Sequence, residues 1–117
     1  MKTLGNANMS KTASAVINIE ASATTSNRVD CRGRQAVSFI IPAMTGTSIA
    51  IHASDDGETF YAVNYNGVAV TLVGSASASW QAIPSNVLAG ANYIRLVSGS
   101  TEAAKRSITV IGLQLVN

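Results

Sequence analysis

Short apolar stretches separated by turn signals run through most of this chain. Apolar residues recur at every second position in Ala15, Ile17 and Ile19, and Ile49 and Ile51 share one face of another stretch. A period of two is typical of a strand that buries one face. The pattern predicts eight strands, at residues 13–20, 35–41, 48–53, 59–64, 68–73, 75–83, 92–98 and 107–115.

The residues between these stretches favour tight turns. Pro42 ends one strand, because proline cannot donate a hydrogen bond to a ladder. Asp56-Gly57 and Asn66-Gly67 supply the positive backbone φ that tight hairpins require, and residues 84–90 form a turn that ends at Gly90. Strands spaced roughly 8–12 residues apart indicate an all-β antiparallel fold, either a sandwich or a barrel.

Composition indicates a single domain with a thin core. The chain has 117 residues, enough to bury one core, and only 5% of them are aromatic. Charged residues make up 12% of the chain, against roughly 25% in a usual domain. The surface is therefore either rich in Ser and Thr or partly covered by partners.

Basic residues are concentrated at the N-terminal end. Residues 1–34 hold five Lys and Arg against two acidic residues, whereas residues 35–117 hold three against four. We therefore distinguish a basic N-terminal arm with a first strand and loop, residues 1–34, from a sandwich body, residues 35–117. This asymmetry predicts an acidic partner surface. The sequence has no basic cluster and no interleaving of basic with aromatic residues, so we expect no direct contact with nucleic acid.

His52 is the only histidine and the one candidate for a general base. The hydroxyls of Ser48 and Ser54 and the carboxylates of Asp55 and Asp56 are near it in the sequence. A catalytic triad needs the base held between nucleophile and carboxylate, and one hairpin with no nucleophile motif does not provide that arrangement. We favour a histidine at a strand end that faces solvent or a subunit contact, and we expect no enzymatic activity.

Two further groups could carry chemistry. Asp55, Asp56 and Glu58 surround one turn and could hold Ca²⁺, but their spacing lacks the alternation of a calcium loop and is explained by turn formation. Cys31 has no histidine beside it in the sequence, so we expect a structural or incidental thiol. We therefore expect neither a metal nor a cofactor.

The sequence also bears on the cellular compartment. A single cysteine excludes an intrachain disulfide and favours a reducing compartment. The first eight residues lack the apolar segment of a secretory leader, and no stretch approaches the roughly 18 consecutive apolar residues of a membrane span. We expect a reducing compartment and no contact with membranes.

The aromatic residues allow two interpretations. They could form a platform on which sugar rings stack, but in a small sandwich they more often belong to the core and its rim, which we favour. Arg95 shares a strand face with Tyr93, so we expect it to lie over an aromatic ring or to pair across strands. The residues concerned are Phe60, Tyr61, Tyr65, Trp80 and Tyr93.

The second half of the chain resembles a known group of proteins. The segments that carry the resemblance are Ser-Asp-Asp-Gly-x-Thr-Phe-Tyr from Ser54, Ile83-Pro84, Ala-Gly-x-x-Tyr-Ile-Arg-Leu-Val-Ser-Gly from Ala89, and Arg-Ser-Ile-Thr-Val from Arg106. Over residues 35–115 the chain is similar to small β-sandwich virion proteins of tailed bacteriophages. Its size and basic arm resemble their capsid decoration proteins, also called cement or staple proteins. The resemblance implies a jelly-roll-like sandwich on the outer surface of an icosahedral capsid, made in the cytoplasm of the bacterial host.

This resemblance implies a structural function without catalysis. The protein would stabilise the head by bridging major capsid subunits, and it would form a homodimer or a homotrimer. A phage tail or fibre protein, or a carbohydrate-binding module of similar fold, is the alternative. For the contact with the partner we expect basic and apolar residues before the body, namely Lys2, Leu4, Lys11, Val16, Ile17, Ile19, Arg28, Arg32 and Arg34.

Overall fold

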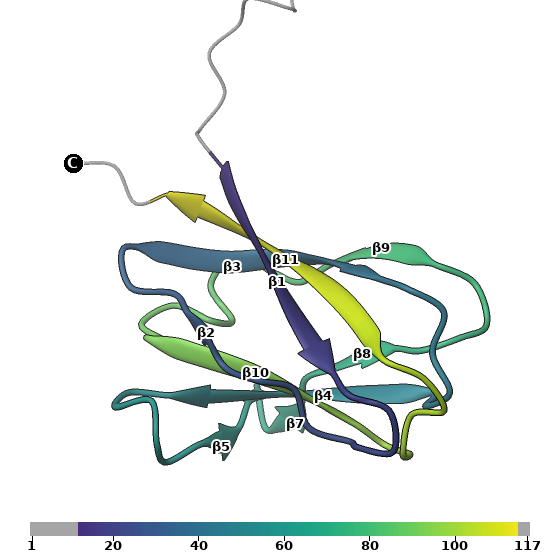
Figure 1. The fold of residues 1–117 in the computed structure, drawn as a ribbon. Coiled ribbons are helices and arrows are strands. Elements are labelled where there is room, and N and C mark those ends of the chain that lie inside the picture. The colour runs from purple at the N-terminus through teal and green to yellow at the C-terminus, as the bar shows by residue number, and fades with distance from the viewer. Residues whose placement is uncertain (1–11, 115–117) are drawn as a thin grey trace, which may run out of the picture.

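Residues 12–114, which we describe from a computed structural model, form two large antiparallel sheets and a separate two-stranded hairpin. These residues form eleven strands and no helix: β1 Thr12–Ile19, β2 Val29–Asp30, β3 Arg34–Ile41, β4 Ser48–Ser54, β5 Tyr61–Ala62, β6 Asn64–Tyr65, β7 Val68–Ala69, β8 Thr71–Val73, β9 Ser79–Ala82, β10 Tyr93–Ser98 and β11 Arg106–Gln114. Sheet A has the order β1-β11-β3-β9. Sheet B has the order β2-β10-β4-β5, with β8 also paired to β4. Figure 1 shows the two sheets facing each other as layers.

The order of the strands is that of a jelly roll. In sheet A, β1 pairs with β11 and β3 with β9, while in sheet B β2 pairs with β10 and β4 with β8. The first half of the chain thus pairs with the second half in reverse order, and successive pairs alternate between the sheets. The expected all-β, jelly-roll-like antiparallel sandwich is confirmed. The β6–β7 hairpin is an addition between β5 and β8.

Aliphatic side chains fill the space between the sheets. The alternation along β4 and β10 buries Ile49, Ile51, Ile94 and Leu96, whereas the residues between them are only partly buried. Among residues 12–114, Phe39 of β3 is the only aromatic side chain in this core. Branched aliphatic residues suit such strands, because they pack well on a pleated surface that is buried on one side.

The expectation that the aromatic residues belong to the core and its rim is wrong for three exposed residues, Trp80, Tyr61 and Tyr65. Trp80 is 63% exposed and Tyr61 is 70% exposed. Trp80 lies directly opposite Ile40 of β3. Since Phe39 and Ile41 on either side of Ile40 point into the core, Ile40 and Trp80 face away from sheet B. Trp80 lies between Ser79 and Gln81, and no other large apolar residue is present in β9, so its own strand carried no pattern that fixed its orientation.

The N-terminal strands belong to the sandwich rather than to an arm. β1 pairs with β11 along its whole length, from Thr12↔Leu113 to Ile19↔Arg106. Residues 21–34, expected to be a loop, contain β2, which pairs with β10. The described part of the sandwich therefore already includes residues 12–34 and is not confined to residues from 35 onwards. The tight hairpin at Asn66-Gly67 is as predicted and joins β6 to β7. Gly57 has the predicted positive φ, but the connection from β4 to β5 spans residues 55–60 and is not a tight turn.

A buried carboxylate joins the loops at one end of the sandwich. Glu102, in the connection from β10 to β11, is 1% exposed. Its Oε1 accepts hydrogen bonds from the Thr45 N–H at 2.8 Å and from Arg106 Nε at 2.9 Å. Its Oε2 accepts from the Gly46 N–H at 2.9 Å and from the Ser98 hydroxyl at 2.7 Å. One side chain thus ties the β3–β4 loop to both ends of the β10–β11 connection.

These donors keep Glu102 ionised. Burial by itself would raise the pKa of Glu102, but the hydrogen bonds from Thr45, Ser98, Gly46 and Arg106 outweigh burial and lower the pKa from 4.5 to about 2. Because the pKa is lower in the folded state, protonation favours unfolding. The stabilisation is fully present above pH 4.5 and is lost as the pH falls towards 2.

Replacing Glu102 by alanine tests this network. Breaking a buried ion pair leaves the remaining partner without compensation, so we expect Glu102→Ala to lower the free energy of unfolding by about 3 kcal/mol at neutral pH. Urea denaturation at neutral pH and again near pH 3 measures the effect. We expect the difference between wild type and variant to shrink at the lower pH. Glu58→Ala, which removes an exposed carboxylate, is the control, and equal effects of the two substitutions would contradict the assignment.

Candidate functional site

The outer face of sheet B carries a cluster of arginines on aromatic rings. The guanidinium groups of Arg28 and Arg32 lie 4.9 Å and 5.4 Å from the centroid of the Tyr93 ring. Tyr93 begins β10 and lies opposite Asp30 of β2, which brings the two arginines that flank Asp30 onto the ring. Arg32 Nη2 is 2.6 Å from Asp30 Oδ2. The hydrogen bond from the Arg32 side chain is the main cause that lowers the pKa of Asp30 to about 2.

A second pair of this kind continues the cluster along β10. The guanidinium of Arg95 lies 4.4 Å from the centroid of the Phe60 ring, which confirms the expectation that Arg95 would cover an aromatic ring. Arg95 is also directly opposite His52 of β4. Burial, and then the charge of Arg95, lower the pKa of His52, so that His52 is neutral at physiological pH. Within residues 12–114, neither His52 Nδ1 nor Arg95 Nε has a hydrogen-bond partner.

We call the residues Arg28, Arg32, Arg95, Tyr93 and Phe60 the basic cluster. The fold brings together basic and aromatic residues that are far apart in the sequence. Basic and aromatic residues therefore alternate on this surface although they do not alternate along the chain. Three positive charges face one paired carboxylate, that of Asp30. A guanidinium held over a ring keeps its charge and becomes restricted in orientation. The basic cluster is therefore suited to a negatively charged partner.

The outer face of sheet A has the opposite character. Cross-strand pairing aligns Val16, Thr109, Ile40 and Trp80 in one row across all four strands. The other side chains described on this face are Ser14, Asn18, Gln35, Ser38, Ala82, Ser107, Ile111 and Leu113, each placed there by its register with that row. Among these described side chains none is charged, and Val16 is 56% exposed. We call this surface the neutral face.

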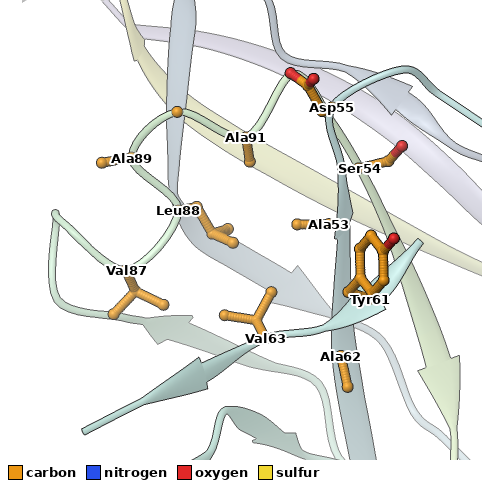
Figure 2. A pocket seen from close by; sticks show the side chains of 11 residues that line it. Ala53, Ser54, Asp55, Tyr61, Ala62, Val63, Val87, Leu88, Ala89 and Ala91 are labelled. Carbon is orange, nitrogen blue, oxygen red and sulfur yellow. The ribbon is translucent and has the colours of Figure 1, made fainter. Parts of the chain in front are cut away.

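A pocket lies at one end of sheet B, beside the β4–β5 hairpin. Figure 2 shows Ala53, Val63 and Leu88 pointing into the same space, with the Tyr61 ring at its edge. Its volume is about 300 Å³. Most of the lining is aliphatic, and the carboxylate of Asp55 at the rim is held by the Asn92 side chain at 3.0 Å. The pocket offers an apolar floor with few polar groups around it.

The residues that were expected to contact a partner do not form one surface. Ile17 and Ile19 are fully buried, so the expectation that they bind a partner is wrong, because their side chains are part of the core. Arg28 and Arg32 lie in the basic cluster, and Arg34 is exposed at the rim of a second pocket of about 240 Å³. Lys2, Leu4 and Lys11 are outside the described residues.

The hairpin around His52 does not assemble a triad. The Ser54 hydroxyl donates to Asp56 Oδ1 at 3.1 Å and accepts the Gly57 N–H at 2.8 Å. Asp56 Oδ1 also accepts the Glu58 N–H at 2.9 Å. These groups form the turn, as the sequence analysis favoured. Within residues 12–114, no three His, Cys, Asp or Glu side chains gather as metal ligands, and the same residues include no helix that could cross a membrane.

The fold places this chain among jelly-roll β-sandwiches, and its surface features are the two contrasting outer faces. No protein-family model matches the chain, and no curated protein matches it.

The basic cluster could not be predicted from the sequence, because the arginines of the β2 region and Tyr93 meet only when β2 pairs with β10. The dense spacing of Arg28, Arg32 and Arg34 was the one signal in the sequence that pointed to this region.

The reactivity of the Cys31 thiol tests how closely the two sheets pack around it. Burial, and then the charge of Asp30, raise the pKa of Cys31 from 9.0 to about 11. Since the thiolate is the reactive form, we expect the folded protein to react with a thiol reagent at pH 8 at least about a hundredfold more slowly than the urea-unfolded protein. Absorbance after addition of an aromatic disulfide reagent measures both rates. Similar rates in the two states would show that Cys31 is accessible.

Proposed function

We propose that this protein is a non-enzymatic structural component of a phage virion, which decorates the outer surface of the capsid and bridges major capsid subunits. The observation that carries the proposal is the chemical contrast between the two outer faces of the sandwich. One face presents the basic cluster and the other presents the neutral face. A protein with two different binding surfaces on opposite sides can contact two neighbours at once, which is what bridging requires.

The basic cluster favours an acidic protein surface as its partner. Its rings already carry guanidinium groups, which leaves less ring surface for stacking on a nucleic-acid base than an open aromatic platform has. Arg32 Nε and Nη2 donate to Asp30 and Arg28 Nη1 donates to the Gly57 carbonyl, so the remaining N–H groups of the two guanidinium groups are the donors that a partner carboxylate would meet. The exposed positions of both arginines let a partner approach without opening the core.

Binding to a symmetric lattice multiplies modest contacts. Each surface of a small domain contributes limited affinity, but contacts made together raise the overall affinity by orders of magnitude. The resemblance to capsid decoration proteins, on the segments from Ser54 to Val110, supports this arrangement. The N-terminal residues Lys2, Leu4 and Lys11 would add a further contact beside the sandwich.

Neutralising one arginine of the basic cluster tests the proposal. We expect Arg32→Gln to weaken binding to phage heads stripped of this protein by about tenfold, because a hydrogen-bonded charge contact is lost. The difference should decrease at high salt, which screens exposed charges. Co-sedimentation with heads of the phage that encodes the chain measures the affinity.

The control is Lys105→Gln, which removes the same charge from the exposed β10–β11 connection, which follows the opposite end of β10 from Tyr93. We expect this variant to bind as the wild type does. If both variants bind heads equally well, or if the wild type does not bind heads at any salt concentration, the proposal is wrong. Thermal unfolding of each variant shows whether a loss of binding reflects a loss of the fold.

Carbohydrate binding on a tail or fibre is the second candidate. It is favoured by the exposure of Tyr61 and Trp80 and by the position of Tyr61 at the edge of the pocket in Figure 2. An exposed ring beside polar groups such as Asp55 can stack on a sugar while the polar groups accept its hydroxyls.

Glycan binding by these two residues can be measured separately. If the pocket binds sugar, Tyr61→Ala should abolish binding on an array of bacterial surface glycans, because the stacking ring is gone. Trp80→Ala should have little effect there, since Trp80 is on β9 of sheet A and is not part of the pocket. Val68→Ala, at another exposed apolar position, is the control. A Tyr61→Ala protein that binds glycans like the wild type would exclude the pocket.

A further inference from the structure

The edges of the two sheets differ in how they are protected. β2 and β5, the edges of sheet B, have two residues each. At the β9 edge of sheet A, the Gln81 side chain accepts the Val73 N–H at 2.8 Å and donates to the Val73 C=O at 2.6 Å, which links β9 to β8 across the sandwich. The remaining edge is β1, which has eight residues.

The hydrogen bonds of Asn18, near the C-terminal end of β1, show which backbone N–H and C=O groups of this strand point away from β11. The Asn18 N–H donates to Asn27 Oδ1 at 2.7 Å, and the Asn18 C=O accepts the Asn27 N–H at 3.3 Å. Asn18 therefore directs its backbone away from β11, and the period of an antiparallel ladder gives the same direction to Val16 and Ser14. Within residues 12–114, no hydrogen bond satisfies the outward backbone groups of these two residues.

β1 also lacks the features that normally prevent an edge strand from pairing. Its sequence, Thr-Ala-Ser-Ala-Val-Ile-Asn-Ile, contains no charged residue and no proline. Its pairing with β11 runs without interruption from Thr12 to Ile19, so no bulge twists the edge away. A long, regular and uncharged edge with an exposed Val16 at its centre is a template for a further strand.

We propose that β1 pairs with β1 of a second copy of this chain. The same edge of two copies can form a ladder only about a two-fold axis perpendicular to the sheet, so the two β1 strands run antiparallel. A second copy suits this edge because the adjoining neutral face has no described charges that would repel each other. The inference does not depend on the proposed function, because it concerns only the contact between copies.

The position of Asn27 selects the register. Since Asn27 occupies the edge at Asn18, the outward groups that remain within β1 are those of Val16 and Ser14 and, by the same period of two, those of Thr12. A two-fold axis at Ser14 uses all three, because it places Ser14 opposite Ser14 of the second copy and Thr12 opposite Val16. The small side chains of Ala13 and Ala15 then meet on the inner side. The two neutral faces become one continuous surface, and both basic clusters stay accessible on the opposite side.

Blocking the edge without disturbing the sandwich tests this contact. Val16→Pro removes an N–H that points away from β11, a position at which an edge strand tolerates proline. We expect the wild type to sediment as a dimer whose population rises with concentration, and the variant to dissociate at least about tenfold more readily, because the symmetric contact loses a hydrogen bond in each copy. Val68→Pro, at an exposed position of the β6–β7 hairpin, should leave the dimer unchanged.

A cysteine pair keeps the inference testable if Val16→Pro does not fold. We expect Ser14→Cys to form a disulfide-linked dimer on oxidation, because opposite residues in the proposed register are within disulfide distance. Ser100→Cys, in an exposed loop, should remain monomeric on a non-reducing gel. Cys31 is buried and does not compete.

Three results would overturn the inference. The first is a wild type that stays monomeric at every concentration, and the second is a dimer that neither Val16→Pro weakens nor Ser14→Cys captures. The third is a dimer that is lost when residues 1–11 are deleted from a protein that still folds, which would assign the contact to those residues. A dimer that survives the deletion and is captured by Ser14→Cys supports pairing of the β1 edges. Binding to phage heads plays no part in any of these results.

Discussion

The Glu102 carboxylate is the constraint on which the arrangement of this sandwich depends. A jelly roll must hold strands from distant parts of the chain at both ends, and here a single ionised side chain accepts four hydrogen bonds from the β3–β4 loop and from both sides of the β10–β11 connection. Gly46 fits this site closely, since a Cβ at that position would overlap the Ser98 hydroxyl. A buried charge is costly unless each of its lone pairs is satisfied, so the loops have little freedom to move apart.

With the loops fixed, the two sheets can present different chemistry to solvent. Period-two alternation commits the inner positions to aliphatic side chains, and the outer positions are free to vary. On sheet B the outer positions collect arginines on the rings of Tyr93 and Phe60. On sheet A they are neutral and include Trp80 and Val16. The proposed bridging function rests on this contrast, and the neutral face agrees with the low proportion of charged residues in the whole chain.

Most strands could be predicted from the sequence, but the sequence did not show which strands form the open edges of the two sheets. Alternation around Ile49 and Ile51, and the turn residues at Asp56-Gly57 and Asn66-Gly67, are local signals that act within a few residues. β2 escaped prediction because it has only two residues and forms through its pairing with β10. The role of Ile17 and Ile19 was misjudged for a related reason. A strand pattern shows that one face is buried, but it does not show whether the chain itself or a partner buries that face.

The sequence by itself determined the all-β class, the positions of the tight turns and the lack of a reactive motif, because these follow from residue types and from spacings shorter than a strand. The tertiary structure alone decided which side of each strand faces outward, which arginine meets which ring and which edge is left open. These properties depend on pairing between residues that are tens of positions apart, such as Asp30 with Tyr93 and Val16 with Thr109. Such pairings are selected by the packing of the whole core, and no local pattern specifies them.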